Sequence, residues 1–350
     1  MPVDTSFKGI EYFESTFRHQ IQADGEIKTR KFVFDKKFGD GADELPVEGN
    51  RYRLIWMPGC PHAHKVVITR KLLGLDRVIS LGTTGILRTD VGWAFTEDPD
   101  ELDPVLKVHY LHDVYLKTDP SFTGRSTVPT IVDEKTGLAV NNDHYYIPIY
   151  LNTAWKKYHK PDAPVLYPEV LRKEIDQLNR YVYERVIEGF YKCGFARSQQ
   201  AYDKGYDQLF EALDTLNQHL KDKRFLFGDY ITDTDVRLYP SLVRFHVAYH
   251  QVFRANRNRL IEFPNLWGYA RDLYQTEGFR DTTYFDLIKK HYQTSPHLRP
   301  LWGNEYGLYA KGPDVSVWEL PHGREQLSGD PEHKFLLNRE SSAKELNKRL

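Results

Sequence analysis

The sequence contains little cysteine and no long apolar run. Only two of its 350 residues are cysteines, Cys60 and Cys193, so a framework of disulfides is excluded. The first residues, MPVDTSFKGIEYFESTF, lack the apolar core of a signal peptide, so we expect a reducing, cytoplasmic compartment. No apolar stretch approaches the roughly 18 residues that a membrane helix requires, so we expect no membrane partner.

The chain also lacks an excess of charge of either sign. Lysine and arginine total 48, aspartate and glutamate total 49, and the net charge is −1. This balance argues against nucleic acid or an anionic membrane as the main partner. No cysteines or carboxylates stand at metal-ligand spacing beside the histidines, so we predict no metal site. The histidines considered are His62, His64, His109 and His112.

The first half of the chain alternates strand and helix patterns. Apolar alternation bounded by turn residues predicts strands at 51–56, 77–82, 126–133 and 137–142. Apolar residues at helical spacing predict helices at 60–75, 100–116 and 143–158. Pro61 suits a first helical turn and Gly74 a helix end, whereas Pro148 must fall in a first turn or kink its helix. The order of these elements predicts a small α/β domain.

The second half is predicted to be all helical. Amphipathic patterns cover 168–191, 198–220, 231–253 and 264–276. One apolar stripe of the second helix consists of Gly205, Leu209, Leu213, Leu216 and Leu220. Thr232 and Asp235 fit a capping box at the start of a buried helix, so their predicted role is structural. The predicted divisions are an extension (1–45), the α/β domain (46–158), a linker (159–167), the helical domain (168–295) and an irregular tail (296–350).

Cys60 stands between a predicted strand and a predicted helix, in RLIWMPGCPHAHK. A helix start presents unpaired N–H groups and the positive end of the helix dipole, both of which stabilise a thiolate. We expect His62, His64 and Lys65 to add positive charge. The sequence therefore predicts that the pKa of the Cys60 thiol is lowered and that the thiolate acts as a nucleophile.

Cys60 has no resolving thiol beside it. Ala63 occupies the last position of what would be a Cys-x-x-Cys motif, and Cys193 lies in an apolar patch typical of a core. A single nucleophile that forms a mixed disulfide needs an external thiol to release it, and glutathione is the simple candidate. Val128 and Pro129 stand where thioredoxin-like folds have a cis-proline facing the active cysteine, so the Val128 backbone could pair with a peptide-like ligand.

These features together resemble the glutathione transferases, in which a thioredoxin-like α/β domain is joined by a linker to an all-α domain. The cap sequence FGDYITDTD is part of that resemblance. Within the superfamily the chain most resembles the xi class, the glutathionyl-hydroquinone reductases, over residues 45–295. The motifs that carry it are CPHAHK, GWAF, STVPTIVD, NND, YKCGFARSQQAY, TDTDVRLYPSLVRFHVAYHQVFRAN, PNLWGYARDLYQTEG and IKKHYQTS.

The resemblance implies a reductase with glutathione as co-substrate. The Cys60 thiolate would attack the sulfur of a glutathionyl-hydroquinone and expel the hydroquinone. A second glutathione would then attack the mixed disulfide and leave as oxidised glutathione. The resemblance also implies a homodimer.

The resemblance assigns roles to further residues of the site. Trp93 would pack on glutathione, the Val128 backbone would pair with it, and Pro129 would hold that edge. Lys117 or Arg125 would reach a glutathione carboxylate. The hydroquinone would lie against tyrosines that hydrogen-bond its oxygens or protonate the leaving carbanion. These tyrosines would be Tyr183, Tyr191 and Tyr292.

Three site positions depart from the family's pattern. His62 stands where the family commonly has tryptophan, and Asp143 and His144 stand where it has Glu-Ser for the γ-glutamyl end. Asp143 keeps a negative charge for an ammonium group on a shorter arm, whereas His144 replaces a small hydroxyl with a ring. A different low-molecular-weight thiol is therefore an alternative. Further alternatives are other thiol-conjugated or halogenated aromatics, protein mixed disulfides, and a non-catalytic scaffold.

Overall fold

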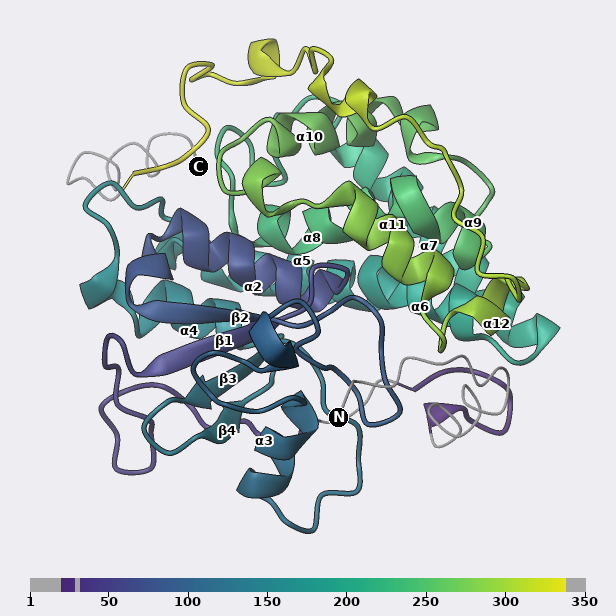
Figure 1. Cartoon of the computed structure of the whole chain (residues 1–350). Coiled ribbons are helices and arrows are strands. Elements are labelled where there is room, and N and C mark those ends of the chain that lie inside the picture. Colours follow the sequence, from purple (N-terminus) through teal and green to yellow (C-terminus); the bar gives the residue numbers. More distant parts are fainter. Residues whose placement is uncertain (1–19, 29–31, 338–350) are drawn as a thin grey trace.

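The computed structural model describes residues 20–28 and 32–337 (Figure 1). Parts of the predicted N-terminal extension (1–19 and 29–31) and of the predicted tail (338–350) lie outside the described residues. The described chain forms a small sheet with helices against it, followed by a helical domain (Figure 1). This confirms the predicted fold class.

The sheet has four strands, ordered β2-β1-β3-β4. Their bounds are Tyr52–Trp56 for β1, Ile79–Thr83 for β2, Thr130–Asp133 for β3 and Leu138–Asn141 for β4. Strand β1 pairs in parallel with β2 and antiparallel with β3, and β3 pairs antiparallel with β4. Every residue of β1 is buried, as expected of a central strand covered on both faces.

Three helices belong to the sheet domain: α2 (Pro61–Leu72), α3 (Leu111–Thr118) and α4 (Ile147–Thr153). Helices α2 and α4 pack on each other, and α3 contacts β4. The helix predicted at 100–116 begins only at Leu111, because Pro104 disfavours a helical Asp103 before it. The Asp103 carboxylate instead binds Arg53 at 2.9 Å and accepts two loop N–H groups. Pro148 falls in the first turn of α4, one of the two predicted outcomes.

The helical domain contains helices at the four predicted ranges and two that were not predicted, α11 and α12. Its helices are α5 (Arg172–Val182), α6 (Glu188–Phe195), α7 (Gln199–His219), α8 (Asp233–Arg244), α9 (His250–Val252), α10 (Pro264–Tyr274), α11 (Phe285–Thr294) and α12 (Arg299–Trp302). A π-helical turn joins α5 to α6 at Tyr183–Ile187, and another joins α8 to α9 at Phe245–Tyr249. The predicted α7 stripe is buried, and Asp235 accepts the Thr232 N–H at 2.7 Å, as a capping box requires. No helix among the described residues is long and apolar enough to span a bilayer.

Short 3₁₀ turns complete the connections. They lie at Leu75–Arg77, Pro99–Glu101, Lys156–Tyr158, Glu169–Leu171, Leu260–Glu262, Arg280–Thr282, Ser316–Glu319 and Glu325–Leu327. The last two belong to the C-terminal segment, which runs over the helical domain past α10 (Figure 1). This segment is irregular, as predicted, but it packs closely, because Trp318 is fully buried.

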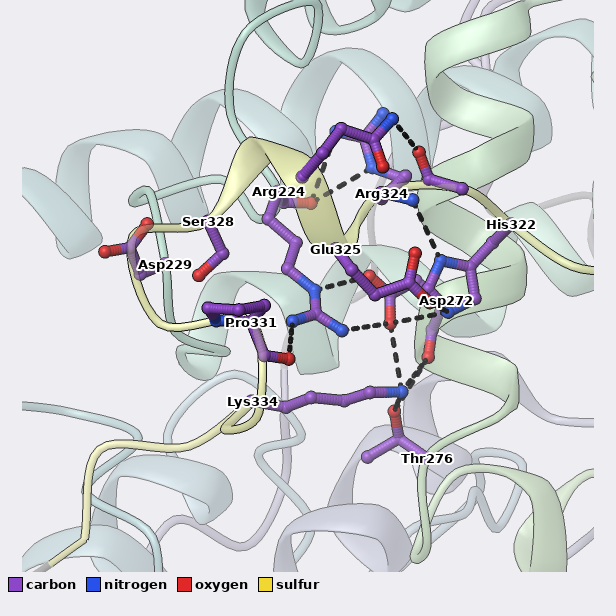
Figure 2. Close-up of polar contacts among 12 residues, drawn as sticks. Arg224, Asp229, Asp272, Thr276, His322, Arg324, Glu325, Ser328, Pro331 and Lys334 are labelled. Atoms are coloured by element: carbon purple, nitrogen blue, oxygen red, sulfur yellow. Dashed lines mark hydrogen bonds and ion pairs between the residues drawn. The ribbon is translucent and has the colours of Figure 1, made fainter.

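A buried ion cluster fastens the C-terminal segment to the helical domain. The carboxylate of Asp272, on α10, accepts the Arg224 Nε at 2.8 Å and the Lys334 Nζ at 2.9 Å (Figure 2). His322 Nε2 lies 3.3 Å from the same carboxylate. Arg324 donates to backbone carbonyls of the 220–224 loop. These groups, here called the Asp272 cluster, tie residues 322–334 to α10 and its neighbours.

Candidate active site

Cys60 lies between strand β1 and helix α2, directly before the first residue of the helix. It is the N-cap residue of α2, with extended backbone angles, and its carbonyl accepts the first helical hydrogen bond from His64 N at 3.0 Å. The thiol is partly exposed and donates to the Val128 carbonyl at 3.4 Å. The Val128–Pro129 peptide bond is cis, as predicted for this position. Residues 68 positions apart thus bring the Cys60 thiol and the backbone that precedes strand β3 together.

The electrostatics of the Cys60 thiol differ from the prediction. Burial raises the pKa of Cys60, and the N–H groups of Ala63 and His62 and the charges of Arg244 and Lys65 only oppose that rise. The predicted lowering is therefore wrong for this state of the protein. The helix start does act in the expected direction, but its effect is smaller than the loss of water around the sulfur.

The neighbouring imidazoles do not supply the expected positive charge. Burial holds the pKa values of His62 and His64 well below the usual histidine value, so both rings are neutral near pH 7. His64 is fully buried, accepts from Arg244 at 3.3 Å through Nδ1 and lies 3.0 Å from Thr282 Oγ1 through Nε2. His64 thus joins the two domains rather than activating the thiol.

Arg244 is a functional residue that the sequence analysis missed. It ends helix α8, is fully buried, and donates to the carbonyls of Gly59 and Pro58 at 2.8 and 2.9 Å. It thereby fixes the loop that carries Cys60 and places a positive charge behind the thiol. The motif TDTDVRLYPSLVRF contained this arginine, but no local pattern connects it to a loop 185 residues earlier.

A cavity of about 210 Å³ opens beside Cys60, between the two domains. Seven of the predicted site residues line it: Cys60, Trp93, Arg125, Val128, His144, Tyr191 and Tyr292. The residues that the sequence analysis did not assign include Arg88, Asn142, Glu188, His291 and His297. The structure therefore brings together segments spread over most of the chain.

Four predicted site residues do not line the cavity. Pro129 is buried, and Tyr183 lies beside the rings of His144 and Tyr145. Lys117 is exposed on α3, where its Nζ covers the β3–β4 turn at Gly137. Because Lys117 lies away from the cavity, Arg125 is the better placed of the two cations proposed for a carboxylate.

Asp143 does not present its carboxylate to the cavity. Its Oδ1 accepts the N–H groups of Tyr145 and Tyr146 at 2.9 and 3.2 Å, at the turn before helix α4. Burial raises the pKa of Asp143, against the effect of these hydrogen bonds and of Lys65. The carboxylate thus stabilises the turn before α4, as aspartates commonly do, and the expectation that it holds an ammonium group is not supported by its position.

A row of phenol groups forms the helical side of the cavity. Tyr191 Oη lies 3.2 Å from Tyr292 Oη, which lies 3.0 Å from Tyr249 Oη. Burial raises the pKa values of all three, so they stay protonated and able to donate near pH 7. Tyr249 is fully buried, yet its hydroxyl belongs to this row.

Helix α11 adds a histidine next to Tyr292. His291 Nδ1 donates to the Ile86 carbonyl at 2.6 Å, and its ring lies 5.7 Å from that of Trp93. A side chain at Gly59 would come within 2.9 Å of this ring, so the glycine before Cys60 permits the close approach. The motif IKKHYQTS therefore supplies two adjacent residues that both reach the thiol site.

Part of the N-terminal extension forms a wall of the cavity. Gln20, Ile27, Lys28, Phe32 and Val33 line it. The amide of Asn142 holds this wall, because its Oδ1 accepts the backbone N–H groups of residues 33 and 34 at 3.3 and 3.1 Å. The Gly25 carbonyl also accepts a hydrogen bond from the Arg197 N–H, just before α7, at 2.9 Å. The extension therefore belongs to the site, which its composition did not indicate.

Possible metal ligands do not gather in the part of the chain that the structure describes. No group of three or more histidine, cysteine, aspartate or glutamate side chains is placed to hold an ion there. Of the four histidines considered from the sequence, His109 donates from Nδ1 to the Glu101 carbonyl at 2.8 Å.

Comparisons with known proteins agree with this arrangement. Residues 199–272 match the family model "Glutathione S-transferase, C-terminal domain". The chain is 36% identical over 317 residues to the glutathionyl-hydroquinone reductase YqjG of Escherichia coli, covering 90% of this chain and 92% of that one.

Two solved structures are also similar. A glutathione transferase from Gordonia bronchialis is 45% identical, with a TM-score of 0.83, 87% of this chain and 93% of that chain being covered. The Xi Class GST from Natrialba magadii is 35% identical, with a TM-score of 0.80. The match covers 88% of this chain and 97% of that chain. With a nucleophile at the Cys-Pro helix start and relatives alike over nearly their whole length, the chain belongs to the xi class of glutathione transferases, the family of the glutathionyl-hydroquinone reductases.

Proposed function

We propose that this protein removes glutathione from glutathionyl-hydroquinones through a mixed disulfide on Cys60. The observation that carries the proposal is the placement of one partly exposed thiol opposite a row of protonated phenols, across a cavity between the domains. The family membership supports the same reaction, since the Escherichia coli relative is named for it.

In the first step, the Cys60 thiol loses its proton to solvent and the thiolate attacks the glutathionyl sulfur. A sulfur–sulfur bond forms, the sulfur–carbon bond breaks, and its electron pair stays on the ring carbon of the hydroquinone. That carbon takes a proton from the row of phenol groups, of which Tyr191 and Tyr292 line the cavity. Arg244 and the N–H groups at the start of α2 stabilise the thiolate.

In the second step, the thiolate of a second glutathione attacks the sulfur that Cys60 carries in the mixed disulfide. Oxidised glutathione leaves and the Cys60 thiolate is restored. An internal thiol does not compete, because Cys193 is fully buried and burial raises its pKa to about 12. The reductant must therefore come from outside the chain.

A single-turnover experiment tests this proposal. Protein mixed with excess glutathionyl-hydroquinone and no free thiol should release one hydroquinone per protomer and gain the mass of one glutathionyl group on Cys60. Addition of glutathione should then start continuous turnover. Release of hydroquinone without an adduct on Cys60, or equal release by Cys60→Ser, would contradict the mechanism.

We further propose that the protein acts as a homodimer in the cytoplasm. The low cysteine count supports a reducing compartment, and exposed apolar side chains at Tyr306 and Leu308 support a contact with a second copy. Light scattering on the purified protein at micromolar concentration measures the mass, and a monomer would contradict the dimer.

A further inference from the structure

His291 lines the cavity with a ring whose hydrogen bond fixes the position of its proton. Its Nδ1 lies 2.6 Å from the Ile86 carbonyl, which can only accept, so Nδ1 carries the proton and Nε2 keeps a lone pair. The side chain is almost fully buried, and among the described residues Nε2 has no hydrogen-bond partner. Because buried polar atoms are normally paired, a ligand group that meets Nε2 in the cavity must be a hydrogen-bond donor.

Burial keeps Nε2 an acceptor. It lowers the pKa of His291 to about 4, the hydrogen bond to Ile86 opposes this fall, and the charges of Arg244 and Arg88 add to it. The ring is therefore neutral near pH 7, whereas a protonated imidazole would donate from both nitrogens. The acceptor is thus present under the conditions in which the enzyme works.

The His291 ring lies close to the reacting sulfur atoms of the proposed mechanism. A side chain at Gly59, the residue before Cys60, would come within 2.9 Å of it. Its centroid lies 4.9 Å from that of Tyr292 and 5.7 Å from that of Trp93. An aromatic ring attached to a glutathionyl sulfur therefore comes beside His291 when that sulfur meets Cys60.

The row of phenol groups and His291 offer complementary hydrogen bonds to such a ring. Two hydrogen bonds join the three hydroxyls of the row, so the row keeps one hydrogen for a ligand. A hydroquinone also has hydroxyl hydrogens of its own, and these need an acceptor. Two other residues of the cavity wall use acceptors within the protein: the Val128 carbonyl accepts the Cys60 thiol, and Asn142 Oδ1 accepts two backbone N–H groups.

We infer that His291 Nε2 accepts a hydrogen bond from a ring hydroxyl of the substrate and thereby selects hydroquinones over their methyl ethers. The inference rests on the proposed function and names a residue that determines its aromatic specificity. A methyl ether keeps the oxygen but lacks the hydrogen, so Nε2 stays without a donor in a site that excludes water. Sites built to bind a hydroxyl reject analogues without it for this reason.

The test compares glutathionyl-hydroquinone with its two monomethyl ethers, all as glutathione conjugates. Single-turnover release of the phenol, without added thiol, gives the second-order rate constant of the first step for each conjugate. With the unaltered protein, at least one ether should react about tenfold more slowly than the parent conjugate, or slower still. Equal rate constants for all three conjugates would overturn the inference.

Two variants separate recognition of the hydroxyl from a structural role of the ring. His291→Asn keeps a donor for the Ile86 carbonyl but has no acceptor at the position of Nε2. It should slow the parent conjugate about tenfold and the discriminated ether much less, because the intrinsic reactivity of each conjugate is the same with every variant. His291→Gln extends a carbonyl oxygen to the position of Nε2 and should restore part of the preference. Equal slowing of parent and ether by His291→Asn would show that the ring only supports the Gly59 loop, and the inference would be wrong.

A binding measurement with the unaltered protein does not depend on turnover or on the folding of a variant. Under anaerobic conditions, free hydroquinone should protect Cys60 from iodoacetamide at about tenfold lower concentration than its dimethyl ether. Equal protection by the two would also overturn the inference. If no conjugate yields its phenol with the unaltered protein, the proposed function itself fails, which is a separate outcome from the result of this binding measurement.

Discussion

Two buried polar regions of this molecule use the same kinds of side chain differently. In the Asp272 cluster, the carboxylate meets the cations of Arg224 and Lys334 at 2.8 and 2.9 Å and the imidazole of His322 at 3.3 Å (Figure 2). Around Cys60, the His62 imidazole and the Tyr292 phenol are neutral and line a cavity. The first region is closed, whereas the second leaves its polar groups available to a ligand.

The first region therefore contributes mainly to stability, whereas the second is suited to binding and chemistry. A buried carboxylate with several cationic partners is costly to disturb, but it has no remaining capacity to bind anything. Neutral donors around a cavity stabilise the fold less, because a ligand rather than a neighbour completes their hydrogen bonds. Perturbed pKa values occur in both regions, so the cavity is the feature that distinguishes the candidate site from the structural cluster.

The largest effect is expected from the two cysteines. Cys60→Ser should lower the reductase rate by about 10⁴-fold or more, because the covalent step is lost. Cys193→Ser should leave the rate nearly unchanged, since Cys193 is fully buried in α6 away from the cavity. Steady-state release of hydroquinone measures both variants. Comparable losses in the two would show that the cavity does not mark the reactive thiol.

Removal of the Asp272 carboxylate tests the structural role of the Asp272 cluster. Asp272→Ala should lower the free energy of unfolding by about 3–5 kcal/mol, because Arg224 and Lys334 lose their buried partner. Urea denaturation measures the loss. Hydroquinone release at low temperature should persist in the folded fraction, and loss of activity with unchanged stability would contradict the assignment of this cluster to structure.

The Asp272 carboxylate also predicts how the free energy of unfolding changes with pH. Burial acts to raise the pKa of Asp272, but the Arg224 hydrogen bonds, Lys334 and His322 outweigh it, so the pKa is lower in the folded state. Its stabilising contribution is therefore complete above the unfolded-state pKa and is lost as the pH falls through the folded-state value. The acid limb of stability against pH should be shallower in Asp272→Ala than in the unaltered protein.

A smaller effect is expected from the phenol row. Tyr292→Phe should lower kcat by about 10²-fold, because it removes the hydroxyl that links Tyr191 and Tyr249. The binding of glutathione should change little, since the ring remains. Stopped-flow measurement of hydroquinone release separates the two quantities. A change confined to KM would indicate that the hydroxyl positions the substrate and does not deliver the proton.

The smallest expected effect concerns the ionisation of the Cys60 thiol. Because burial raises the pKa of Cys60, the rate of its alkylation by iodoacetamide should rise about tenfold for each pH unit up to pH 9, without a plateau. Mass spectrometry of the peptide that contains Cys60 follows the reaction. A plateau near neutral pH would restore the original expectation of a lowered pKa.

Much of the fold could be predicted from the sequence because its signals are local. The start of α2 after Cys60 follows from Pro61. The start of α8 follows from Thr232 and Asp235, which form the hydrogen bond predicted for a capping box. The main error in the sheet domain, the overlong helix before Leu111, also has a local cause, since Pro104 marks where the helical pattern should have been rejected.

The sequence by itself determined the nucleophile, the cis-proline edge and the family, because each depends on residues that are neighbours in the chain. Only the tertiary structure decided the surroundings of the thiol. Arg244 reaches the Cys60 loop from α8, the N-terminal extension forms one wall, and the Asp143 carboxylate bonds to the turn before α4 instead of lining the cavity. The pKa of Cys60 was decided in the same way, since the loss of water depends on every segment that packs around the sulfur and no single motif encodes it.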